Sequence, residues 1–162
     1  MFCLELGRLL CDETILPTYN RVVCLPILLF AVSIFFLFHP IRIEQNGVAG
    51  TLPFEMNRLQ SLRFLLLEEG VLTGTIPPEL GDVRTLEQID LNFNLLQGPI
   101  PETLYFLTNL RQMDLNDNEL SGSVSTRIGN LKQLTFFQIE QNQFTGKIPS
   151  EMGGLAKLGE FF

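Results

Sequence analysis

Few residues in this sequence could carry out chemistry. Its only histidine is His39, and its three cysteines are Cys3, Cys11 and Cys24, so zinc sites and histidine-based triads lack parts. We find no glycine-rich phosphate loop, no zinc-protease motif and no nucleophile elbow. The run 114–119 superficially resembles a calcium loop, but the glycine and final glutamate of such a loop are out of place. The sequence therefore predicts no enzyme, no metal and no cofactor.

Composition restricts the class of protein further. The chain has 162 residues, room for one domain, and 46% of them are hydrophobic while 18% are charged. A disordered chain would show the opposite balance. The formal net charge is −7, which disfavours a nucleic-acid partner because such partners need a basic surface.

Residues that could bind a ligand alternate with apolar residues inside a 24-residue period. In residues 86–109 the apolar residues lie at offsets 0, 3, 5, 10, 14, 18 and 21 from the start. The same offsets are apolar in 38–61, 62–85, 110–133 and 134–157, while 158–162 begin a sixth repeat. This spacing predicts a solenoid of five repeats over 38–157, in a chain that we expect to be a fragment.

Each offset has a structural meaning. The apolar-x-apolar segment at offsets 3 to 5 fits a short strand that pairs in parallel with its neighbours. An asparagine at offset 8 can satisfy backbone groups where the chain turns, which predicts a structural ladder of Asn46, Asn94, Asn118 and Asn142. The apolar pair at offsets 18 and 21 predicts a short α or 3₁₀ turn, and we expect the glycine after the first of the pair (Gly81, Gly129, Gly153) to end it.

Two segments carry a resemblance to a known family. Residues 72–81 read LTGTIPPELG and residues 144–153 read FTGKIPSEMG. They resemble the signature of plant-type leucine-rich repeats, and the resemblance covers residues 38–162. It implies an α/β solenoid, a right-handed superhelix with a parallel concave β-sheet and a second short strand around the G-x-I-P segment. It also implies a likeness to ectodomains of receptor-like proteins and kinases, although Ser125 replaces a signature proline and the cysteine-bearing N-terminal cap of the family is not found.

The first forty residues are of a different kind. Val22 to Phe38 form a run of 17 residues without a charge, which at ~1.5 Å per residue spans roughly 25 Å as a helix. We interpret this run as an apolar transmembrane helix, with 1–21 in the cytosol and the repeats outside the cell. A signal peptide and a buried cap on the first repeat are the alternatives.

Outward-facing residues supply the candidate ligand site. Offsets 2, 4, 6 and 7 are expected to point out of the concave sheet, and they are rich in acidic and aromatic residues. The candidate ligand-binding residues are Phe64, Leu66, Glu68, Glu69, Asp90, Phe93, Asp114, Asp117, Phe136 and Glu140. The alternative interpretation is an ordinary solvated sheet face.

The function that these patterns favour is recognition. We expect a membrane-anchored, receptor-like leucine-rich-repeat protein that binds a peptide or protein, with basic groups, on its concave sheet. A co-receptor would be a further partner. The alternative is a secreted structural or inhibitory module of the type that binds cell-wall or matrix enzymes.

Overall fold

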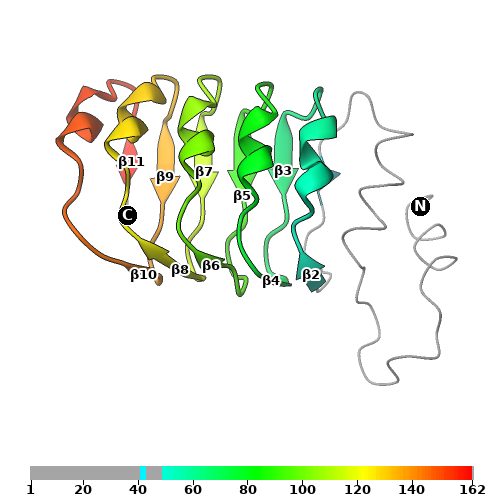
Figure 1. Ribbon diagram of the computed structural model, residues 1–162. Coiled ribbons are helices and arrows are strands. Elements are labelled where there is room, and N and C mark those ends of the chain that lie inside the picture. Colours follow the sequence, from blue (N-terminus) through cyan, green and yellow to red (C-terminus); the bar gives the residue numbers. More distant parts are fainter. Residues whose placement is uncertain (1–40, 43–48, 162) are drawn as a thin grey trace, which may run out of the picture.

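The apolar-x-apolar segments form the main sheet of the computed structural model, which describes residues 41–42 and 49–161 (Figure 1). All pairs in this sheet are parallel, and Leu65, Ile89, Met113 and Phe137 align at steps of 24 residues. The prediction of a parallel sheet is therefore confirmed. Within the described residues the strand order is β1 (Ile41–Arg42), β3 (Phe64–Leu66), β5 (Gln88–Asp90), β7 (Gln112–Asp114), β9 (Phe136–Gln138) and β11 (Glu160–Phe161).

A second set of strands follows each turn. Two further parallel sheets form, β2–β4 and β6–β8–β10, joined by a single bridge between Thr75 and Gln97. Their partners lie 22 residues apart, as in Ala49 with Val71, so this set shifts by two residues per repeat relative to the main sheet. These strands end at or near the glycine of the G-x-I-P segment, earlier than the sequence predicts. They are β2 (Ala49–Thr51), β4 (Val71–Thr73), β6 (Gln97–Gly98), β8 (Glu119–Gly122) and β10 (Gln143–Phe144).

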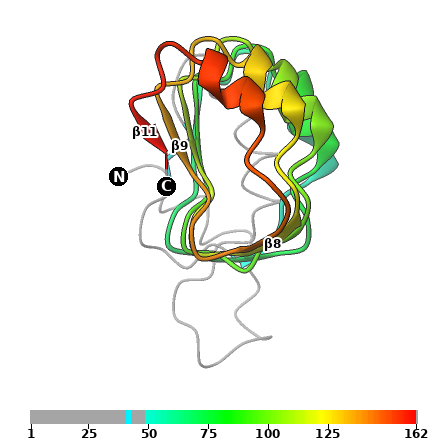
Figure 2. The ribbon, with the colours of Figure 1, turned by 90° about the vertical axis from the view of Figure 1, so that its left-hand side faces the viewer.

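Short 3₁₀ helices lie on the side of the solenoid opposite the main sheet (Figure 2). They are η1 (Phe54–Arg58), η2 (Pro78–Asp82), η3 (Glu102–Phe106), η4 (Thr126–Asn130) and η5 (Ser150–Gly154). A proline in extended conformation precedes all of them except η4, where Ser125 takes its place. None of the helices in the described part is long and apolar enough to cross a membrane. The apolar segment Val22–Phe38 lies outside the described residues.

The glycines inside these helices have a different role from the one expected. Gly81, Gly129 and Gly153 do not end their helices, which continue to Asp82, Asn130 and Gly154. A Cβ atom at Gly81 would lie 2.5 Å from backbone atoms of Thr103 in η3. Gly81 therefore allows successive helices to approach closely, which is a packing requirement and not a termination signal.

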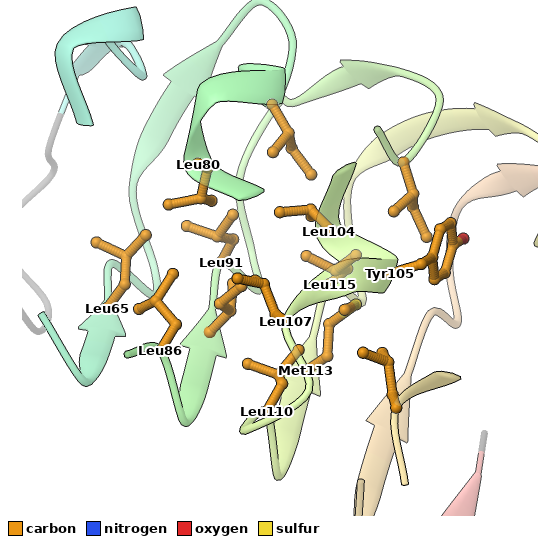
Figure 3. Close-up of a cluster of buried hydrophobic side chains, with 14 of the residues drawn as sticks. Leu65, Leu80, Leu86, Leu91, Leu104, Tyr105, Leu107, Leu110, Met113 and Leu115 are labelled. Atoms are coloured by element: carbon orange, nitrogen blue, oxygen red, sulfur yellow. The ribbon is translucent and has the colours of Figure 1, made fainter. Parts of the chain in front are cut away.

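The core is a continuous column of leucine-rich layers between the main sheet and the helices (Figure 3). The strands contribute Leu65, Ile89 and Met113, and the helices contribute Leu80 and Leu104, all fully buried. Each such side chain stabilises the fold by about 1.5–3 kcal/mol through burial. Because each repeat packs on its neighbours, the sheet forms one supported surface.

Candidate ligand-binding face

Buried asparagines fix the chain where it leaves the main sheet. The Oδ1 atom of Asn118 accepts the N–H of Leu96 at 2.9 Å, and its Nδ2 donates to the carbonyls of Leu91 and Leu115 at 2.9 and 3.2 Å. Asn94 and Asn142 make equivalent bonds to their own and the preceding repeat. Asn46 lies outside the described residues. These amides bond to backbone rather than to one another, so they hold neighbouring turns in register.

The ten candidate residues divide into two groups at this turn. Glu69, Phe93 and Asp117 have φ values of 54°, 50° and 50°, in the left-handed region. The main-sheet strands end three residues earlier, at Leu66, Asp90 and Asp114. This corrects the expectation that offset 7 belongs to the concave sheet, because the chain reverses there to reach the buried asparagine.

The other seven residues form what we call the strand face. Adjacent strands align Leu66 with Asp90 and Asp90 with Asp114, while a second row begins at Phe64 and ends at Phe136. Most of these side chains are half-buried, but Asp114 is only 9% exposed. Asp114 is therefore less accessible than the alternation of the strand predicts. The strand face consists of Phe64, Leu66, Glu68, Asp90, Asp114, Phe136 and Glu140.

Two neighbouring carboxylates dominate the electrostatics of the strand face. Asp90 accepts the N–H of Asn92 at 3.3 Å, and Asp114 accepts the N–H of Asn116 at 3.2 Å and the Asn92 amide at 3.4 Å. Burial raises the pKa of Asp90 to about 7, and the negative charges of Asp114 and Glu68 add to this effect. Burial also raises the pKa of Asp114, but its additional hydrogen bond opposes that increase. The strand face is thus less negative at neutral pH than residue counting suggests.

Basic side chains gather elsewhere on the solenoid. No lysine or arginine occurs in residues 64–76, 88–100, 112–124 or 136–146. The ion pairs of the described part join Arg63 and Arg111 to Glu87, and Arg127 to Glu102, outside those ranges. A hollow of about 400 Å³ also lies there, lined by residues such as Glu87 and Lys132 and by none of the ten candidates. Within the described residues, no basic side chain forms an ion pair with Asp90 or Asp114.

Two exposed residues were missed by the sequence reasoning. Val71 and Leu95 are 46% and 44% exposed, directly before the buried Leu72 and Leu96. Their offset holds Glu119 and Gln143 in the following repeats. That contrast in the same position was the available signal, because a position that is polar elsewhere is not required for the core.

Comparison with known proteins agrees with this architecture. The family described as Leucine Rich Repeat matches residues 85–107 and 109–131. No curated protein sequence matches the chain.

Three similar solved structures are of plant proteins. The plant peptide hormone receptor RGFR1, in complex with RGF2, is 33% identical with a TM-score of 0.69, over 70% of this chain and 18% of the receptor. A chain of the BIR3–SERK2 complex from Arabidopsis thaliana is 31% identical with a TM-score of 0.66, over 68% of this chain and 60% of that one. A plant ice-binding protein is 30% identical with a TM-score of 0.66, over 70% of this chain and 37% of that protein.

These similarities cover most of the repeat region, but the chain spans less than two thirds of each relative. The parallel sheet, the 3₁₀ helices and the buried asparagines are shared across its repeats. The chain belongs to the leucine-rich-repeat family and resembles the ectodomains of plant receptors.

Proposed function

We propose that the strand face binds an extended peptide, or an extended segment of a protein, that carries basic and apolar side chains. The observation that carries this proposal is the adjacent pair Asp90 and Asp114, which has no basic partner in the described part of the chain. Half-buried carboxylates without a counter-ion favour a cationic ligand, because a cation would offset their mutual repulsion and their loss of hydration. The chain would then act as a recognition module without catalysis of its own.

The dimensions of the strand face suit a short peptide. Phe64 and Phe136 lie at the two ends of one row, three strand steps apart, which is ~14 Å at ~4.8 Å per step. An extended peptide rises ~3.4 Å per residue, so about six residues would cross five strands. Basic side chains would face Asp90 and Asp114, and apolar ones would rest on the phenylalanines.

Relatives support the same class of ligand. RGFR1 is a peptide hormone receptor solved with RGF2, and BIR3 forms a complex with SERK2. By analogy we propose a peptide ligand for this chain and a second receptor-type protein as a further partner. The analogy concerns the class of ligand alone, since the chain spans only 18% of RGFR1.

A pair of matched hexapeptides tests the strand-face proposal. One alternates lysine with leucine and the other alternates glutamate with leucine, and each is titrated against the full chain at low and high salt. We expect only the lysine peptide to bind, and its binding to weaken at high salt because exposed charges are screened over about 8 Å at physiological strength. The variant carrying Asp90→Asn and Asp114→Asn should lose most of this salt dependence. The exposed Asp82→Asn serves as control. Equal binding of both peptides would reject the proposal.

We also propose that Val22–Phe38 anchors the chain in a membrane with the repeats on the extracytoplasmic side. This proposal rests on the uncharged run of 17 residues. Carbonate extraction of membranes from cells that express the full chain tests it. Retention in the pellet is the expected result, whereas release of the chain into the supernatant would favour the secreted module.

A further inference from the structure

Three large apolar side chains are exposed together at the turn that follows the main sheet. Val71, Phe93 and Leu95 are 46%, 51% and 44% exposed. The N–H of Gly70 donates to the carbonyl of Phe93 at 3.1 Å, and the N–H of Leu95 donates to the carbonyl of Leu72 at 2.8 Å. These bonds place Val71 and Phe93 in adjacent turns, with Leu95 two residues further on. We call these three residues the turn-edge patch.

The backbone offers no reason for an aromatic residue at position 93. Its φ of 50° lies in the left-handed region, which bulky side chains rarely adopt and which asparagine, aspartate and glycine tolerate better. The next repeat has Asp117 at the equivalent position, with the same φ. The ring of Phe93 is half exposed, so the core does not need it either. An unfavourable backbone conformation retained with an exposed aromatic ring points to a role in binding.

Acidic residues surround the turn-edge patch. The N–H of Glu69 bonds to the carbonyl of Asn92 at 3.2 Å, and the N–H of Asn94 bonds to the carbonyl of Asp117 at 3.1 Å, so a carboxylate lies in the turn on each side of Phe93. Glu119 adds a third carboxylate, which accepts only the neutral amide of Gln97 at 2.7 Å. No lysine or arginine occurs in the segments 64–76, 88–100 and 112–124 that build this edge.

We propose that the turn-edge patch is a second interaction surface, separate from the strand face, for a basic segment of another polypeptide that inserts one aromatic or large aliphatic side chain. An apolar centre with a charged rim is the usual anatomy of a protein interface, and here the rim has one sign. The partner's apolar side chain would pack on Phe93, Val71 and Leu95, and its basic side chains would face Glu69, Asp117 and Glu119.

The proposal goes beyond the strand-face function and can fail independently of it. The strand face is built by residues of the main sheet and by Glu68 and Glu140, whereas the patch is built after the chain has turned. A substitution in one surface can therefore be compared with a substitution in the other.

The chain provides a direct optical test because it contains no tryptophan. The probe is a nine-residue peptide with one central tryptophan between lysines and glycines, and its emission is followed as the full chain is added. We expect a shift to shorter wavelength on binding, and no shift when glutamates replace the lysines. Phe93→Asn should weaken the affinity about tenfold or more, as expected for an interface anchor. Urea unfolding should show this variant to be at least as stable as the wild type, since asparagine suits the backbone.

Two control variants locate the peptide. Gln141→Asn places the same residue at another left-handed position outside the patch and should leave the affinity unchanged, as should Phe136→Ala on the strand face. If Phe136→Ala weakens binding and Phe93→Asn does not, the peptide occupies the strand face and the patch proposal is overturned while the proposed function stands. Absence of binding would also overturn it, as would a concentration-dependent mass in sedimentation that Phe93→Asn abolishes, because the occupant would then be a second copy of this chain.

Discussion

The backbone N–H of Ser125 donates to the phenol oxygen of Tyr105 at 3.4 Å, which links two departures from the repeat pattern. Tyr105 occupies the position that is glycine in three other repeats, and its side chain is fully buried. Ser125 occupies the position that is otherwise proline, and proline has no N–H to donate. One substitution therefore provides the partner that the other one needs, because a buried hydroxyl without a partner is costly.

This link predicts coupled effects on stability. Ser125→Pro should destabilise the chain by about 1–3 kcal/mol, because Tyr105 loses its partner and the side-chain bonds of Ser125 to Arg127 and Glu102 are also lost. In the Tyr105→Phe background the same change should cost about 1 kcal/mol less. Urea unfolding of the four proteins measures this coupling. Strictly additive effects would show that the two residues act independently.

The helix glycines predict a graded response to alanine. A Cβ atom at Gly81 would lie 2.5 Å from Thr103, one at Gly129 would lie 3.0 Å from Cβ of Glu151, and one at Gly153 would have no neighbour within 4 Å. Gly81→Ala should therefore lower the free energy of unfolding by about 1–3 kcal/mol or more, because backbone must move. Gly129→Ala should cost less, and Gly153→Ala is the matched control, expected to be neutral or slightly stabilising. Thermal midpoints in any other order would contradict the packing role of Gly81.

The buried asparagines predict one loss and one gain of stability. Asn118→Ala leaves the N–H of Leu96 and the carbonyl of Leu91 without this partner and should cost about 1–3 kcal/mol. Gly70→Asn introduces the asparagine that this repeat lacks and should be neutral or stabilising. Chemical unfolding of each variant tests the pair. Asn109→Ala, in which an exposed amide is removed, should change stability by less than about 1 kcal/mol.

Asp90 predicts a specific dependence of stability on pH. Its pKa is about 7 in the folded chain against an ordinary value of 3.8. Between these values the folded chain binds more protons than the unfolded chain, so the free energy of unfolding falls as the pH rises from about 4 to about 7. Asp90→Asn should reduce this fall and be more stable than the wild type at pH 8. If both proteins lose the same stability between pH 5 and pH 8, Asp90 is not the group responsible.

Much of the scaffold followed from the sequence because the repeat repeats its physical constraints. The apolar spacing predicted the parallel sheet, and the hydrogen bonds of Asn94 and Asn118 lie at the turn where the spacing placed these residues. The glycines were harder to interpret, because a glycine that ends a helix and one that admits a neighbouring helix look identical in sequence. Gly81 is of the second kind.

The candidate site was less predictable than the scaffold. Alternation along a strand gives the direction of a side chain but not its depth, so the burial of Asp114 and the raised pKa of Asp90 required the structure. The left-handed turn at Phe93 also could not be read from a period, because neighbouring repeats place different residue types there. The bond between Tyr105 and Ser125 joins residues of two repeats that the pattern treats as separate exceptions.

The most direct test of ligand binding on the strand face is the carboxyl titration of Asp90, followed by NMR with and without the alternating lysine–leucine hexapeptide. Without peptide the midpoint should lie near pH 7. A cationic side chain beside this carboxylate favours its charged form, so saturating peptide should move the midpoint to lower pH, and the affinity should rise as the pH increases from 6 to 8. A midpoint that stays near pH 7 while the peptide is bound would contradict recognition at this face.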